Sequence, residues 1–170
     1  MTPALRAWEV SRMFRRAGAL AVVALLLTSA VSAENRAPWM GTWQLDPARG
    51  TQRASRSPYK RVTLRISAHG DGLTVVYDMV GTRGGVSHRE WTGRFDASDY
   101  PMQGVDIVMT NAYRLVDDRT YEIAVKVDGN PLATATATVS PDGSTLSVVT
   151  RERDARGQAV ESTAVYTRVQ

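Results

Sequence analysis

The amino-acid sequence predicts an all-β fold: an antiparallel up-and-down meander of about eight to nine strands closed into a barrel. From residue 59 onward apolar and polar residues alternate almost without a break, as in strands with one buried face. No stretch after residue 34 has the apolar periodicity of a helix. Most links between the alternating runs are short, which excludes the long crossovers that parallel strands need. A β-sandwich is the alternative, with residues 47–58 and 96–104 as the longer connections that it requires.

The first 33 residues are predicted to be a secretory signal peptide and not part of the fold. Four arginines between residues 6 and 16 precede an apolar run over 17–27, and Val31-Ser32-Ala33 supplies small residues for cleavage. The apolar run is shorter than the ~20 residues of a membrane span. We therefore expect residues 34–170 to form one periplasmic or secreted domain with no membrane span after cleavage. The pair Arg15-Arg16 leaves both the general and the twin-arginine export routes open.

Charge and cysteine content exclude several classes of function. Removing a leader with four arginines and one glutamate lowers the formal net charge from +4 to +1, so charge does not indicate a nucleic-acid partner. The chain has no cysteine. This excludes a disulfide framework, thiol catalysis and a cysteine-based metal site.

The first strand is predicted over residues 39–46, where Thr42, Gln44 and Asp46 alternate with Trp43 and Leu45. The following stretch, 47–58, is rich in Arg, Ser and Pro and is interpreted as a surface loop or lid. Strands follow over 59–68, 73–79, 86–95, 105–115, 120–127 and 131–140, then around residue 147 and over 159–168. Glycine-containing turns separate most of them, and Asp128-Gly129 is a strong hairpin signal. Residues 96–104 are expected to form a loop.

Alternation also predicts which residues face the barrel interior. In the strand over 86–95, Trp91 and Phe95 favour the face that also carries Ser87 and Arg89. Thr and Ala alternate along 132–139, which brings little bulk and suits a cavity, whereas a filled core is the alternative for a barrel of this size. The candidate inward residues are Val62, Leu64, Ile66, Leu73, Val75, Tyr77, Met79, Trp91, Ile107, Met109, Tyr113, Tyr121, Ile123 and Val125.

The sequence contains no recognisable catalytic or metal-binding arrangement. No serine lies in a Gly-x-Ser-x-Gly motif, and His69 lies in a glycine-rich turn. His88 alternates with Glu90, a pattern that favours a polar pair on the solvent face over a metal site. Two histidines cannot form a three-histidine zinc site. We therefore expect no enzyme activity, no metal and no cofactor.

Gly41-Thr42-Trp43 near the start of the predicted domain resembles the Gly-x-Trp motif in the first barrel strand of the lipocalin-like (calycin) superfamily. The chain is most similar to small exported bacterial lipocalin-like proteins, through residues 41–45, 95–101, 139–146 and 165–168. The resemblance implies a closed barrel, and it implies that a late arginine, Arg168, covers Trp43; the alternative is that Arg168 is a solvated residue in the tail of the chain. A Thr-Asp-Tyr motif, a C-terminal helix and a helical lid are missing from this chain, so the resemblance bears on the fold more than on the ligand.

The function predicted from these patterns is that of an exported, non-enzymatic binding protein with a small hydrophobic ligand in its barrel. Methionine and tyrosine among aliphatic residues suit an apolar ligand with a polar end. The predicted lining residues are Tyr77, Met79, Trp91, Met109, Tyr113 and Tyr121. The alternative is a protein-binding or protease-inhibitor-like module that acts through its loops and has a filled core. An outer-membrane barrel is rejected because the non-core strand faces carry charged residues such as Arg65 and Glu122.

Overall fold

The computed structural model describes residues 37–51 and 59–169, within a compact unit that spans Arg36–Gln170. The predicted signal peptide, residues 1–33, and residues 52–58 of the predicted loop lie outside this part of the chain. No helix long and apolar enough to cross a membrane is found among the described residues. Ten strands make up the fold: β1 (Gly41–Gly50), β2 (Tyr59–His69), β3 (Gly72–Gly81), β4 (Val86–Gly93), β5 (Tyr100–Gln103), β6 (Met109–Leu115), β7 (Thr120–Val127), β8 (Asn130–Val139), β9 (Thr145–Arg153) and β10 (Ala159–Val169).

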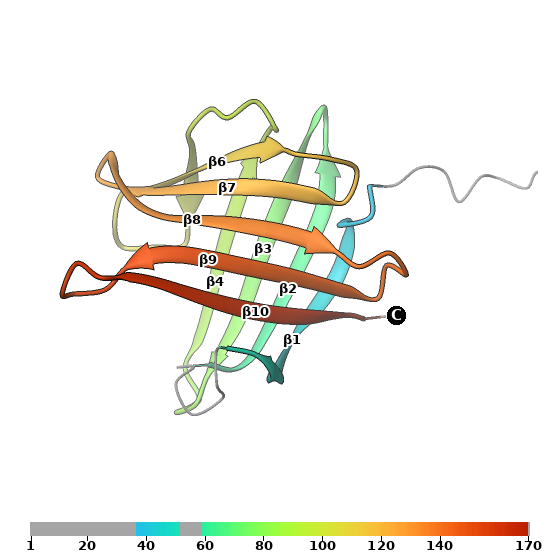
Figure 1. The fold of residues 1–170 in the computed structure, drawn as a ribbon, viewed down its shortest axis with the longest axis horizontal. Coiled ribbons are helices and arrows are strands. Elements are labelled where there is room, and N and C mark those ends of the chain that lie inside the picture. The colour runs from blue at the N-terminus through green and yellow to red at the C-terminus, as the bar shows by residue number, and fades with distance from the viewer. Residues whose placement is uncertain (1–36, 52–58, 170) are drawn as a thin grey trace, which may run out of the picture. The chain divides into compact units, whose positions relative to one another are not determined.

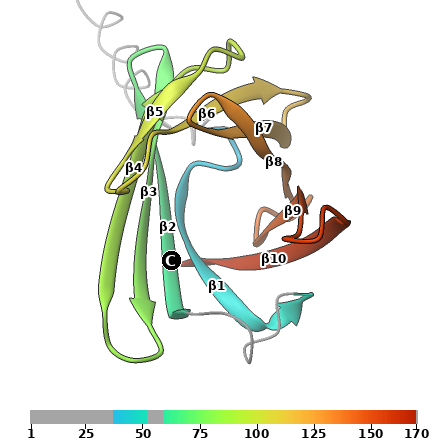
Figure 2. The same cartoon turned by 90° about the vertical axis from the view of Figure 1, so that its left-hand side faces the viewer.

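The strands form a closed antiparallel barrel in which each strand pairs with its neighbours in sequence. The barrel closes through β1 and β10, where Trp43 lies opposite Arg168 and Leu45 lies opposite Tyr166. Figure 2 shows β1 between β2 and β10, and in Figure 1 strands β7–β10 cross in front of β2–β4. The predicted antiparallel meander and its closure between the first and last strands are confirmed. Closure pairs the two strand edges that an open sheet would expose.

The number of strands is ten, not the predicted eight to nine, because Tyr100–Gln103 forms the short strand β5 within the predicted loop 96–104. This strand pairs at only two residue positions with each neighbour. Four residues that include a proline, Pro101, are too few to show a strand period in the sequence. Because β5 is so short, it brings β4 close to β6.

The predicted inward position of Ile107 is wrong, since the Ile107 side chain is 51% exposed. Strand β6 begins at Met109 and not at residue 105. Gly104 has a φ of 75°, a left-handed conformation that ends β5, and the Val108 carbonyl accepts a hydrogen bond from the Asp128 amide. The segment before Met109 therefore follows the β7–β8 turn, and its alternation does not reflect a strand.

Side chains from nearly every strand pack together in a core inside the barrel. Trp43 of β1, Leu64 of β2, Leu73 of β3 and Trp91 of β4 are almost completely buried. On β8 the alanines face the core, since Ala135 and Ala137 are buried, and the threonines between them lie on the opposite face. The Thr/Ala alternation thus places the smallest side chains of the barrel inside it.

Candidate functional site

One end of the barrel is sealed by Trp39, Trp43 and Arg168. The Arg168 guanidinium carbon lies 4.1 Å from the centroid of the Trp43 ring, which is fully buried. The same guanidinium donates hydrogen bonds to the carbonyls of Met40 (2.7 Å), Gly143 (2.7 Å) and Pro38. Trp43 Nε1 donates to the Trp39 carbonyl at 2.8 Å. Of the two roles that the sequence left open for this arginine, the structure therefore shows the contact with Trp43 and not a solvated tail.

Gly41 is required at this end because of both its conformation and its surroundings. Its φ is 125°, which side-chain-bearing residues rarely adopt, and an added Cβ would lie 2.7 Å from Arg168 Nη1. Burial lowers the pKa of Arg168. The three predicted motif residues Gly41, Trp43 and Arg168 thus lie together at this end of the barrel.

Three of the six predicted lining residues form a continuous aromatic stack. Trp91 and Tyr113 stack with centroids 3.9 Å apart, and Tyr113 and Tyr121 stack at 5.5 Å. Tyr121 also contacts Trp39 edge to face, which joins the stack to the sealed end. Trp91 and Tyr113 are fully buried and Tyr121 is 3% exposed. These three side chains form the floor of any space that remains in the barrel.

The other three predicted lining residues, Tyr77, Met79 and Met109, lie on the same inward face beyond the stack. Met79 is buried, whereas Tyr77 and Met109 are half-buried. Burial raises the pKa of Tyr77, although part of its side chain stays accessible. Tyr77 therefore packs against the core without being completely enclosed by it.

Four phenol groups gather inside the barrel. Burial and the neighbouring Tyr77 raise the pKa of Tyr113 well above its ordinary value, and burial together with Tyr77 also raises the pKa values of Tyr121 and Tyr166. Tyr77 is therefore close to each of the other three. Tyr166 is not among the predicted lining residues, because strand alternation does not show how phenols from four strands converge.

Packing is less complete where the barrel interior extends away from the sealed end. Several apolar side chains there contact the core but remain half-buried. They come from both sides of the barrel and are Leu45, Tyr59, Tyr77, Val125, Val148 and Ala164. This region combines apolar walls with phenol hydroxyls, the pattern expected of a site for an apolar molecule with a polar end.

Four buried side-chain polar atoms have no close hydrogen-bond partner among the described residues. Trp39 Nε1 lies at the sealed end, Ser87 Oγ lies on β4 opposite the buried Met79, and Asn111 Oδ1 and Tyr113 OH lie on β6. Asn111 pairs with Val125 across the sheet, which places its side chain on the inward face, and the Tyr113 hydroxyl has the Tyr77 hydroxyl as a neighbour that influences its pKa. Buried polar groups are nearly always hydrogen-bonded, so Ser87 and Asn111 mark places where a water molecule or a ligand is expected.

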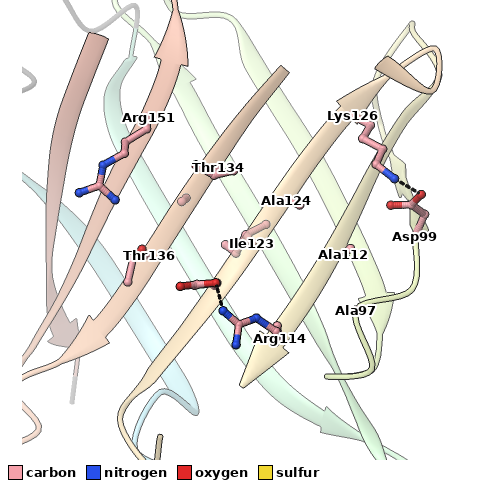
Figure 3. Close-up of a pocket in the computed structure, with 12 residues that line it drawn as sticks. Ala97, Asp99, Ala112, Arg114, Ile123, Ala124, Lys126, Thr134, Thr136 and Arg151 are labelled. Atoms are coloured by element: carbon pink, nitrogen blue, oxygen red, sulfur yellow. Dashed lines mark hydrogen bonds and ion pairs between the residues drawn. The ribbon is translucent and has the colours of Figure 1, made fainter. Parts of the chain in front are cut away.

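A second concave feature lies on the outer face of β6–β9, with a volume of about 340 Å³ (Figure 3). Its floor consists of the small side chains Ala112, Ala124, Thr134 and Thr136. Three ion pairs border this concave feature: Arg114–Glu122 at 2.5 Å, Lys126–Asp99 at 2.7 Å, and Arg151–Glu161 at 2.9 Å. Sequence analysis did not identify this outer groove, since it arises where small outward residues of adjacent strands come into register.

The polar pair expected on the solvent face is present across strands β3 and β4, and the partner of His88 is Asp78. His88 Nδ1 lies 2.7 Å from Asp78 Oδ1, whereas His88 Nε2 is 4.0 Å from Glu90 Oε2. Arg65 also reaches Asp78, at 2.6 Å, and the hydrogen bond from His88 is the largest factor that lowers the Asp78 pKa. The described residues contain no group of three or more side chains suited to bind a metal ion. This polar network lies on the outer face and is largely exposed.

Comparison with known proteins adds little to this geometry. No family model and no curated protein matches the chain. Among solved structures it is similar to the siderocalin Ex-FABP, described as functioning "through dual ligand specificities". The two chains share 15% sequence identity over 78% of this chain and 71% of the other, with a TM-score of 0.33. This likeness does not establish a family or a ligand.

Proposed function

We propose that this protein is a non-enzymatic binding protein that holds a small apolar ligand with a polar end inside its barrel. The observation that carries the proposal is the group of half-buried apolar side chains, Tyr77 among them, that pack against the core inside the barrel away from its sealed end. The ligand would rest on the stack of Trp91, Tyr113 and Tyr121 and contact Tyr77, Met79 and Met109. The half-buried apolar side chains around it would supply the hydrophobic contacts.

We further propose that the protein acts in the periplasm or as a secreted protein, after cleavage near Ala33. The basic, apolar and small-residue pattern of residues 1–33 supports this location. A domain without cysteine suits either compartment, because its stability does not depend on redox conditions.

The experiment that tests ligand binding is native mass spectrometry of the purified protein combined with titration of a fluorescent fatty-acid probe. A co-purifying small molecule or a saturable probe signal is the expected result. The substitution Ala164→Leu adds bulk to the half-buried interior and should reduce probe binding while the fold is retained. Ala124→Leu makes the same change in the outer groove and should leave probe binding intact.

The second candidate function is that of a protein-binding module, and the outer groove favours it. If no probe saturates and Ala164→Leu strongly destabilises the protein, the interior is already filled. A pull-down would then be expected to recover a protein partner. If Ala124→Leu abolishes this recovery and Ala164→Leu does not, the function belongs to the outer groove.

A further inference from the structure

We propose that the ligand carries an anionic head group and that Arg89 binds this head group from the barrel wall. The proposal rests on the proposed function and specifies its ligand: a single-chain amphiphile with a negatively charged end. It makes Arg89, which lies outside the predicted lining, the specificity-determining residue.

The position of Arg89 follows from the strand register. Arg89 lies directly opposite Tyr77 in the β3–β4 pair and two residues before Trp91 on the same strand. Directly paired residues of antiparallel strands project from the same face, and so do residues two apart. Because Trp91 is fully buried in the core and Tyr77 packs against the core, the Arg89 side chain leaves β4 on the inward face.

Arg89 lacks the partner that every comparable basic residue has. Four basic side chains are half-buried in the described part of the chain: Arg89, Arg119, Lys126 and Arg168. Arg119 and Arg168 donate to backbone carbonyls, and Lys126 pairs with Asp99. No hydrogen bond or ion pair joins Arg89 to another described residue. A half-buried cation without a partner is unfavourable, and a bound anion would offset that cost.

The interior offers Arg89 little intrinsic negative charge. Among acidic residues in the described strands, Asp78, Glu122 and Glu161 pair with outward basic residues. Asp46 and Glu90 follow or precede the inward Leu45 and Trp91 by one residue and therefore lie on the outer face. Glu152 lies opposite Ala133, which in turn lies opposite the core-facing Val125, so Glu152 shares the inward side, but it is exposed at the far end of β9. No acidic residue of the described strands therefore completes the Arg89 site, and an anionic ligand would supply the missing group.

Further polar groups project inward from β4 and from the nearby β6. Ser87 Oγ, two residues before Arg89 on β4, is buried without a partner among the described residues. Trp91 Nε1 donates to the Asn111 carbonyl at 3.1 Å, and the Trp91 ring stacks on Tyr113, which brings β4 and β6 together across the short β5. Tyr113 and Tyr77 are neighbouring phenols whose hydroxyls can donate to an anionic oxygen, and Asn111 can bind a polar atom or a water. An arginine, a phenol donor and an amide around one apolar space form a set suited to a carboxylate or phosphate head.

The test compares twelve-carbon chains that differ only in their heads: dodecanoate, dodecyl phosphate and dodecan-1-ol. Each competes with the fluorescent probe for the purified protein at neutral pH. We expect at least one anionic chain to bind at least about tenfold more tightly than the alcohol, since charge-assisted hydrogen bonds are about twice as strong as neutral ones. The preferred anion distinguishes a carboxylate from a phosphate head. If the alcohol binds as tightly as both anions, the anionic head is refuted while ligand binding stands; if no chain binds, the proposed function itself fails.

Substitutions at Arg89 test whether this residue binds the anionic head group. Arg89→Gln should lose about tenfold or more in affinity for the anionic chain and little for the alcohol, and Arg89→Lys should keep part of the preference. Arg61→Gln removes an exposed arginine of β2 and should change neither affinity. Without ligand, Arg89→Gln should unfold at the same temperature as the unsubstituted protein or higher, because it removes an unpartnered charge. Unchanged anion affinity in Arg89→Gln would overturn the assignment, as would an equal loss for the anion and the alcohol.

Discussion

At the scale of single residues, Arg168 connects three separate segments of the chain through its hydrogen bonds. It holds the chain before β1 by the carbonyls of Pro38 and Met40, and it holds the β8–β9 turn by that of Gly143. Its position over Trp43 adds a cation–π contact, worth ~0.5–2 kcal/mol depending on how far water is excluded. One side chain thus connects both ends of the barrel sequence.

We expect Trp43→Ala to lower the free energy of unfolding by ~3–5 kcal/mol, the cost of truncating a fully buried aromatic side chain. Arg168→Ala should cost less, and the two losses should not add in the double variant, because the side chains touch. Urea denaturation of the four proteins measures this coupling. Arg156→Ala, in an exposed turn, is the control and should be nearly neutral. Strictly additive losses would contradict a functional contact between the two side chains.

Gly93 gives a second prediction at this scale. A Cβ at Gly93 would lie 2.5 Å from Trp91 Cζ2 and 2.7 Å from two ring atoms of Tyr100, so the aromatic stack would have to move. Gly93→Ala should therefore destabilise by ~1–3 kcal/mol, as overpacking does. Gly85→Ala is the matched control, since an added Cβ there meets no atom within 4 Å. The unfolding temperatures of the two variants are compared by near-ultraviolet circular dichroism, which reports on the tryptophans. Equal losses in the two variants would argue against close packing at Gly93.

At the scale of elements, the β8–β9 turn is fixed by one carboxylate. Asp142 accepts hydrogen bonds from the hydroxyls of Ser140 and Ser144 and from the Ser144 amide, and the serine hydroxyl bonds are prominent among the causes that lower its pKa from 3.8 to about 2. The same turn receives the Arg168 guanidinium through Gly143. The turn therefore links the last hairpin to the sealed end of the barrel.

Because folding lowers the Asp142 pKa, the ionised carboxylate favours the folded state, and this contribution is fully present above the unfolded pKa of about 4. It should be lost as pH falls from about 4 to about 2. Urea midpoints measured over this range should fall less steeply in Asp142→Asn, which cannot ionise, than in the unsubstituted protein. An NMR titration that places the Asp142 pKa near its ordinary value would contradict the hydrogen-bond pattern of the turn.

At the scale of the whole molecule, closure makes the barrel one cooperative unit. Strand β1 pairs with β2 on one side and β10 on the other, so the first and last strands depend on each other. The compact unit begins at Arg36, three residues after the predicted cleavage site. Nothing in the pairing of the described strands requires the preceding segment.

Residues 34–170 expressed alone should therefore fold, with a β-type far-ultraviolet circular dichroism spectrum and one cooperative unfolding transition. The full chain expressed with export should give a mature protein whose intact mass corresponds to cleavage near Ala33. A helical spectrum would contradict the fold, and a periplasmic protein that still begins at Met1 would contradict the signal-peptide prediction.

The sequence by itself determined the fold class and most strand positions, because alternation and short turns are local properties of the chain. The inward positions of Trp91 and Tyr113, and the pairing of β1 with β10, followed from that alternation and from the need to close the sheet. The Gly41, Trp43 and Arg168 set came from the resemblance to a barrel family.

Only the tertiary structure decided what depends on strands that are distant in sequence. Strand β5 was missed because its four residues are defined by their partners and not by a period of their own, and Ile107 was misplaced for the same reason. The outer groove appears where small residues of β6–β9 fall into register. The sequence shows that there is an arginine at position 89, but it does not show which carboxylates the fold brings near it. Only the structure shows that Arg89 has no partner among the described residues.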